Sequence, residues 1–341
     1  MLILSGLWVD HYPAVVSRWT TAAMASEELI RALLYASLAA VGVPGNSAVI
    51  GAFLLALHQE RRLLPADAIL LHLASANLLV VGVRCLLETL ASFRLANVFS
   101  DAGCRWVIFV YRTTRSLSIW LTFVLSAYQC LSIAPPGSRW AAARALAARY
   151  MAAIFLALWV INTCMSTAAV LFSLGARNDS SLASHAINVQ FCFVRFPSRL
   201  SKQANGAAQV GRDVVPMSLM AVASLVILVF LYRHSRQVKG LRSSGGAGGG
   251  AERRAAKAVV ALVTLYVVLY GVDNGLWVYT LTVSRTMSSS LTSDLRIFFS
   301  SLYAALSPIV IIATNRKVLS RLRCVRQEKP LMEKATTLST S

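Results

Sequence analysis

The chain of 341 residues is short of charged side chains, which make up only 14% of it. Soluble domains carry about 25% charged residues, so this composition excludes a protein that covers its whole surface with polar groups. Hydrophobic residues account for 57%, and the mean hydropathy is +0.62. Lipid is therefore the expected solvent for much of the chain.

Acidic residues are the scarcer of the two charge types, with 14 Asp and Glu against 33 Lys and Arg and a net charge of +19. A basic patch on a folded soluble surface would indicate nucleic-acid binding. Here the basic residues fall in the gaps between apolar runs, where membrane proteins keep their cytoplasmic charge. The pattern favours a membrane protein with no nucleic-acid partner.

Cysteine is also scarce, and its six residues are too few for a disulfide scaffold. No group of His, Cys and carboxylate residues has the spacing of a zinc site. The glycine-rich stretch 245–250 lacks the Lys-Ser/Thr pair that ends a phosphate-binding loop. We therefore expect no enzyme activity, no catalytic residues, no metal and no cofactor.

Long apolar runs, by contrast, are abundant. A transmembrane helix needs about 20 mostly apolar residues, and lipid admits only backbone whose hydrogen bonds are satisfied within the segment. Seven runs meet this requirement: Leu29–Leu57, Ala66–Ala91, Cys104–Ile133, Ala148–Leu171, Val214–Tyr232, Ala258–Thr282 and Leu295–Thr314. The sequence predicts an all-α bundle of seven transmembrane helices over residues 29–314.

The orientation follows from the Lys and Arg residues, which crowd the gaps after the first, third and fifth runs and the segment after the seventh. The basic side is expected to be cytoplasmic. Residues 1–28 then form an extracellular N-terminus, and residues 315–341 form a cytoplasmic tail. Asn178, in the sequon Asn178-Asp179-Ser180, falls in the long extracellular loop and is a predicted glycosylation site.

Two cysteines fall on the same predicted side of the membrane. Cys104 opens the third run, and Cys192 lies in the long extracellular loop. The extracellular side is oxidising, so we expect a disulfide that pins this loop over the bundle; the alternative is two free thiols. In the tail, apolar and basic residues alternate in the manner of a short amphipathic helix on the inner leaflet. Cys324 there is either palmitoylated or a free thiol.

Several predicted spans carry ionisable residues, which are costly in lipid and usually face the bundle interior. Pairs spaced by three or four residues share a helix face. They either bind ligand or form internal ion pairs that only fix helix packing. With neighbouring polar groups, they supply the candidate ligand-binding residues: Arg84, Glu88, Tyr111, Arg112, Arg115, Asp273 and Asn274.

The balance of these charges predicts a ligand type. If Glu88 pairs with Arg84 on its own helix, only Asp273 is left to oppose Arg112 and Arg115. The two third-span arginines then keep unpaired positive charge. A guanidinium offers a planar fork of donors that matches a carboxylate, so the site is predicted to prefer an anionic small molecule.

Short motifs resemble known receptors. Gly45-Asn46, Cys104 and Ser307-Pro308 resemble the rhodopsin-like G protein-coupled receptors. More specific stretches are similar to the vomeronasal type 1 and fish class A-related olfactory receptors, over residues 45 to about 315. They are His72–Asn77, Tyr111–Ser118, Leu125–Pro135 with Ser138–Ala141, Arg212-Asp213, Arg233-His234 and Glu252–Ala255.

The departures from the wider class matter as well. Tyr128-Gln129-Cys130 stands where most rhodopsin-like receptors have Asp-Arg-Tyr, and Asn77 stands where they have a sodium-binding Asp. The seventh span has no Lys, which excludes a retinal Schiff base. Tyr111 takes the place of the Asp that holds amines, so an amine ligand bound through that carboxylate is not expected.

The resemblance implies a chemosensory receptor of the plasma membrane of chemosensory neurons. It binds a small molecule in the outer half of the bundle and activates a heterotrimeric G protein of the inhibitory class. The alternatives are a bitter-taste-like or other orphan receptor and, less in keeping with the lack of internal repeats, a transporter or channel. The G protein-facing candidates are Gln129, Arg139, Arg233, His234, Arg253 and Arg254.

Overall fold

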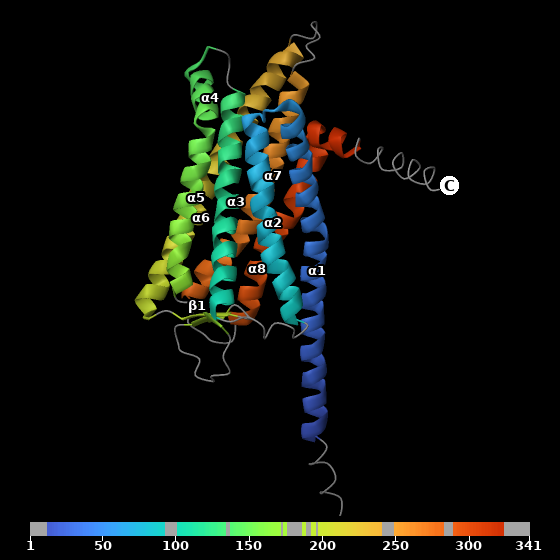
Figure 1. Ribbon diagram of the computed structural model, residues 1–341, viewed down its shortest axis with the longest axis vertical. Helices are drawn as coiled ribbons and strands as arrows, with labels where there is room; N and C mark the ends of the chain where they lie inside the picture. Colours follow the sequence, from blue (N-terminus) through green and yellow to red (C-terminus); the bar gives the residue numbers. More distant parts are fainter. Residues whose placement is uncertain are drawn as a thin grey trace, which may run out of the picture.

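The computed structural model is a bundle of long helices that carries a small sheet at one end (Figure 1). It describes residues 12–92, 101–133, 137–171, 173–175, 186–188, 192–195, 197–240, 249–282 and 289–323. The helices are α1 (Tyr12–Glu60), α2 (Pro65–Ser92), α3 (Asp101–Ser132), α4 (Arg139–Arg149), α5 (Met151–Leu171), α6 (Arg199–Gly240), α7 (Gly249–Thr282) and α8 (Ser289–Thr314), followed by a short helix over residues 316–323. The predicted all-α bundle is confirmed.

Helices α4 and α5 are joined at a break where their axes differ by 67°. In the described residues, four helices are long and apolar enough to cross a membrane, and this bent pair is a fifth. Helix α3 falls short of that standard, and the apolar part of α7 among the described side chains is Val260–Leu276. For α3 the reason is its polar interior: residues 113–118 are all buried, and Leu117 is the one apolar side chain among them. Such a helix is surrounded by other helices rather than by lipid.

The surface of the bundle is apolar along its outer helices. Leu33 on α1, Leu156 on α5 and Leu225 on α6 are each more than 60% exposed. A soluble protein rarely leaves such long apolar stripes uncovered. These faces fit a lipid environment, as the low content of charged residues predicts.

Helix α1 packs closely on α8 because two glycines of α1, Gly42 and Gly45, lie where the helices cross. A Cβ atom added to Gly45 would lie 2.9 Å from Cγ of Pro308. One added to Gly42 would lie 3.0 Å from the Cα atom of Ala305. Small residues allow this close backbone approach between helices in a membrane, where dispersion contacts rather than the hydrophobic effect hold helices together.

A small antiparallel sheet lies against the beginning of α3. Its strands are β1 (Ser173–Gly175), β2 (Ala186–Asn188) and β3 (Cys192–Arg195), in the order β1-β3-β2. The sequence predicts only a loop here, since strands of three or four residues are too short to show a periodic pattern. We call this end of the bundle the sheet end, and the opposite end, which carries the helix 316–323, the tail end (Figure 1).

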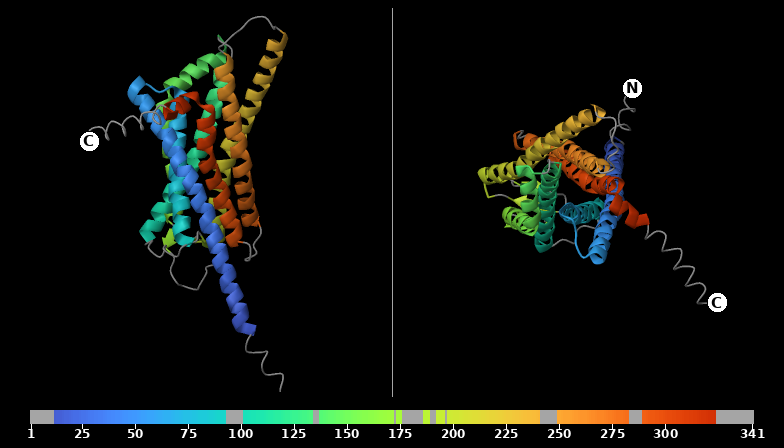
Figure 2. Two further views of the ribbon diagram at one scale, coloured as in Figure 1. Left: turned by 90° about the vertical axis from the view of Figure 1, so that its right-hand side faces the viewer. Right: turned by 90° about the horizontal axis from the view of Figure 1, so that it is seen from above.

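The helix over residues 316–323 turns away from the bundle axis after α8 (Figure 2). Val318 is fully buried, and the Nζ atom of Lys317 lies 3.2 Å from the carboxylate of Asp67 on α2. Arg321 lies 2.6 Å from the carboxylate of Glu60 at the end of α1. The short helix is therefore anchored to the tail ends of α1 and α2 by one apolar contact and two ion pairs.

Candidate functional site

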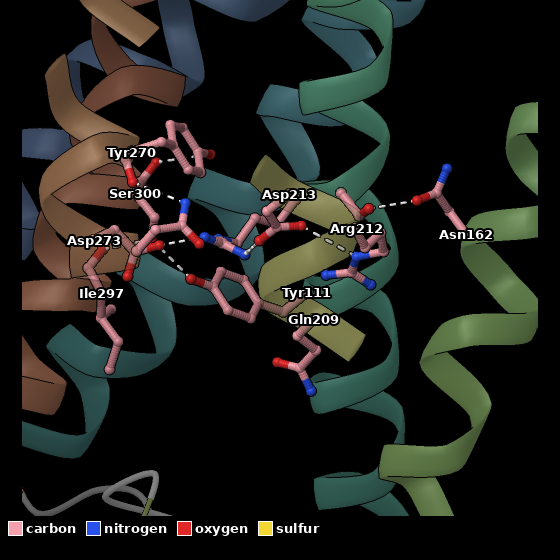
Figure 3. Close-up of polar contacts among 12 residues, drawn as sticks. Tyr111, Asn162, Gln209, Arg212, Asp213, Tyr270, Asp273, Ile297 and Ser300 are labelled. Atoms are coloured by element: carbon pink, nitrogen blue, oxygen red, sulfur yellow. Dashed lines mark hydrogen bonds and ion pairs between the residues drawn. The ribbon is translucent and has the colours of Figure 1, made fainter. Parts of the chain in front are cut away.

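The most highly charged place inside the bundle is centred on Arg115 of α3. Its guanidinium donates to the carboxylate of Asp213 on α6 at 2.6 Å and to the carboxylate of Asp273 on α7. All three residues are buried, with the aspartates only 2% exposed. One planar fork of donors thus joins three helices, a geometry in which charge-assisted hydrogen bonds are strong. Figure 3 shows the two aspartates converging from α6 and α7.

A second arginine balances the charge of this group. Arg212, also buried, donates from Nε to the other oxygen of Asp213 at 3.1 Å. The ring of Tyr270 on α7 lies 5.0 Å from the guanidinium carbon of Arg115, within the range of a cation–π contact. We call Arg115, Arg212, Asp213 and Asp273 the Arg115 cluster; it holds two positive and two negative side chains.

The prediction that Arg115 keeps unpaired positive charge is wrong. It counted only Asp273 as an acidic partner, because Asp213 precedes the fifth apolar run, which begins at Val214. In the structure α6 begins at Arg199, well before the apolar run that starts at Val214. Arg212 and Asp213 therefore lie inside the helix and face the interior. The sequence shows that Arg212 and Asp213 are adjacent. It does not show that they are buried, because α6 extends beyond its apolar part.

A neighbouring group joins α2, α3 and α8. Arg84 and Glu88 form a buried ion pair along α2, which confirms the pairing considered from their spacing of four residues. The ring of Tyr111 on α3 lies 5.5 Å from the guanidinium carbon of Arg84. The hydroxyls of Tyr111 and Ser300 on α8 are hydrogen-bonded at 2.9 Å. Tyr270 donates to the backbone carbonyl of Ser300 at 3.3 Å and so connects this group to the Arg115 cluster.

The remaining ligand-site candidates lie close to these groups along the chain. Arg112 lies three residues before Arg115, so it shares a face of α3 with it, and its side chain is half-buried. Asn274 is buried beside Asp273 and donates to the backbone carbonyl of Tyr270 at 2.9 Å, within its own helix. The structure therefore brings Arg115, Asp273 and Tyr111 into interhelical contacts, whereas the described hydrogen bond of Asn274 stays within α7.

Uncharged hydrogen bonds cross the middle of the bundle. Asn77 on α2 donates to the hydroxyl of Ser307 on α8 at 2.8 Å, and Ser118 on α3 donates to Asn77 at 2.6 Å. Ser116 donates to Asn162 on α5. The buried asparagines thus join helices, as polar residues in apolar spans usually do. Asn77 thus donates to one helix and accepts from another.

Beyond this network, three tyrosines pack in the core. The rings of Tyr266 and Tyr270 on α7 stack with centroids 4.3 Å apart. Tyr303 on α8 meets Tyr266 edge-on at 5.1 Å, and its hydroxyl is hydrogen-bonded to that of Thr122 at 3.0 Å. All three tyrosines are fully buried. The sequence alone does not reveal this cluster, because tyrosines four residues apart on a helix are more often ordinary core residues.

The predicted disulfide involves the sheet end. Cys104 on α3 is buried and disulfide-bonded, whereas Cys85, Cys130 and Cys164 are free. Cys192 is the first residue of β3, in the sheet that lies against α3.

The other predicted sites are only partly described. Gln129 is half-buried near the end of α3, and Arg139 and Arg233 are exposed on α4 and α6. His234, Arg253 and Arg254 belong to helices, but their side chains lie outside the described residues. Asn178 and Cys324 also lie outside the described residues.

Comparison with known proteins decides the family. Residues 29–324 match the model of the vomeronasal organ pheromone receptor family. The chain belongs to the vomeronasal type 1 receptor family. It is similar to olfactory receptor class A-like protein 1 of Danio rerio, with 38% identity over 88% of this chain and 94% of that protein. It is also similar to vomeronasal type-1 receptor 1 of Homo sapiens, with 26% identity over 85% of this chain and 82% of that protein.

The fold matches that of a solved receptor. Squid rhodopsin superimposes with a TM-score of 0.68 over 90% of this chain and 87% of its own, at 14% sequence identity. This likeness supports the fold alone. Together with membership of the vomeronasal type 1 family, it makes the chain a multi-pass membrane receptor of the G protein-coupled class and not an enzyme.

Proposed function

We propose that this vomeronasal type 1 receptor is a chemosensory receptor that binds a small molecule in the sheet-end half of its bundle and then activates a heterotrimeric G protein of the inhibitory class. The observation that carries the proposal is the convergence of buried charged and hydroxyl groups from α2, α3, α6, α7 and α8. Such groups are costly inside a membrane protein and mark functional sites.

The sheet end is proposed to face the outside of the cell. Lys and Arg are concentrated at the other end, which the charge rule assigns to the cytoplasm. Cys104, which is disulfide-bonded, lies at the sheet end, and bonds of this kind persist in the oxidising exterior. We propose Cys192 of β3 as its partner. The bridge would hold the sheet against α3 at the end of the bundle from which a ligand is proposed to enter.

Within this half, the ligand is proposed to contact the face of α3 that carries Tyr111, Arg112 and Arg115. Arg115 already forms ion pairs with two carboxylates. We therefore propose that an acidic or acceptor-rich group of the ligand binds at Arg112. This residue is half-buried and lies one turn nearer the sheet end. A guanidinium has five N–H donors, so it can bind a ligand acceptor in addition to contacts within the protein.

The test is a ligand screen in cells that express the receptor, with calcium and cAMP measured. Loss of one charge-assisted contact in a dry site costs about 2–5 kcal/mol, or roughly thirty-fold or more in affinity. Arg112→Ala should therefore weaken an acidic agonist by about that factor and a neutral analogue far less, at similar surface expression. Arg112→Lys should rescue only in part, because a point charge does not reproduce the fork. A best agonist that is a cationic amine and is unaffected by either change would overturn the assignment.

A further inference from the structure

The described ion pairs differ in the helices that they connect. In the part of the chain whose side chains are described, Arg84–Glu88 lies within α2, and the pairs of Lys317 and Arg321 attach the tail-end helix to α2 and α1. Arg115 forms ion pairs that join α3 to both α6 and α7. A movement of α6 or α7 relative to α3 at this depth must therefore change the contacts of one guanidinium.

The tail-end half of α3 differs in character. Gln129 is uncharged and half-buried near the end of α3. Deeper in the bundle than the Arg115 cluster, α7 presents Leu262, Val263 and Tyr266 to the core. The hydroxyl of Tyr266 is fully buried and has no hydrogen-bond partner among the described residues. Packing of this kind is not directional, so it restrains the relative position of the helices less sharply than ion pairs do.

The Arg115 cluster is well suited to hold one arrangement of helices. Its charges balance only while both aspartates stay in place, and removing one partner leaves an uncompensated charge in a low-dielectric interior. The two carboxylates come from different helices, so α6 and α7 are each fixed to α3. A contact that is formed in one conformation and lost in another biases the equilibrium between them.

We propose that the Arg115 cluster is an ionic clamp that holds α6 and α7 against α3 in the resting receptor, and that opening of the Arg115–Asp273 contact accompanies activation. This vomeronasal type 1 receptor then carries an ionic restraint in the sheet-end half, one helical turn from Arg112, where the ligand group is proposed to bind. A ligand that draws either partner away would act on the restraint directly. The predicted effect on signalling rests on the proposed function, but the predicted movement of the helices does not.

The first experiment measures ligand-free signalling per receptor at the cell surface. Asp273→Asn keeps the shape of the side chain and removes its charge, so basal signalling should rise on the order of ten-fold, equivalent to about 1.4 kcal/mol in the equilibrium between the two states. Glu60→Gln is the matched control: it neutralises an acid that pairs with Arg321, away from α3, α6 and α7, and should leave basal signalling unchanged.

Charge exchange separates a clamp from a simple loss of packing. Arg115→Asp alone should raise basal signalling or reduce folding, since three acidic residues then meet. Arg115→Asp combined with Asp273→Arg restores two positive and two negative side chains to the cluster and an arginine–aspartate pair between α3 and α7, and should return basal signalling towards the wild-type level. Arg115→Lys keeps the charge but cannot form a fork to two carboxylates, and should give an intermediate value. Failure of the exchange to restore a low basal level in a well-expressed receptor counts against the clamp.

The second experiment needs no G protein. The purified full chain is spin-labelled at Arg139→Cys on α4, which packs on α3, and at Ala261→Cys on α7, both exposed towards the tail end, with Cys130, Cys164 and Cys324 replaced by Ser. Asp273→Asn should broaden the distance distribution between the labels, and the charge-exchanged pair should narrow it again. Altered distances without any signalling in any variant would retain the clamp and reject the G protein function. An unchanged distribution in folded Asp273→Asn would reject the clamp, whatever the signalling result.

Discussion

The crossing of α1 and α8 allows a quantitative prediction. In Gly45→Ala the new Cβ atom would lie 2.9 and 3.2 Å from the Cγ and Cβ atoms of Pro308, inside the optimal carbon–carbon separation of about 3.5–4.0 Å. The proline ring is rigid, so the helices must separate, and overpacking of this kind costs about 1–3 kcal/mol. Alanine regains about 1 kcal/mol through its helix propensity. The net loss of stability is therefore about 0–2 kcal/mol.

Gly51 on the same helix supplies the control, because nothing lies within 4 Å of the Cβ atom that an alanine would add there. Gly51→Ala should stabilise the receptor by about 0.5–1 kcal/mol. The two variants should thus differ by about 1–3 kcal/mol, or from a few to about ten degrees in the unfolding temperature of detergent-purified receptor, at roughly 2–4 °C per kcal/mol. If Gly45→Ala proved as stable as Gly51→Ala, the close approach of α1 to α8 would not exist as described.

Three further predictions concern modification and covalent structure. Cys104→Ser and Cys192→Ser should each lower surface expression, and the double variant should be no worse than either; strictly additive losses would show that the two thiols act separately. Glycosidase treatment should increase the gel mobility of the wild type but not of Asn178→Gln, and an unglycosylated wild type from a competent secretory pathway would contradict the predicted orientation. If Cys324 is palmitoylated, acyl-exchange labelling should be lower in Cys324→Ser than in the wild type. Unchanged labelling would show that Cys324 does not carry the acyl group.

Much of the fold follows from the apolar runs. A stretch of about 20 apolar residues has few stable conformations in lipid other than a helix, so the spans are visible without any structure. The ends of the helices are less predictable, because a helix can continue beyond the membrane, where no apolar run marks its course. The extension of α6 back to Arg199 has no apolar signal, and the three short strands of the sheet have none either.

The candidate site was predictable as a set of residues but only partly as a set of contacts. The spacing of Arg84 and Glu88 by four residues predicts their ion pair, because both lie on one helix face. The partners of Arg115 are 98 and 158 residues away along the chain. No periodicity within one helix reveals which faces of three helices meet, so the role of Asp213 required the packed structure.

Ligand-dependent nucleotide exchange tests the central claim most directly. Purified full-length receptor in phospholipid vesicles would be combined with an inhibitory-class heterotrimeric G protein, and exchange would be followed with water-soluble acids, neutral analogues and amines. We predict that at least one acid accelerates exchange, that Arg112→Ala weakens this response, and that Asp273→Asn raises the rate without ligand. Exchange that stays at the rate of the G protein alone with every ligand class and with Asp273→Asn would contradict the account.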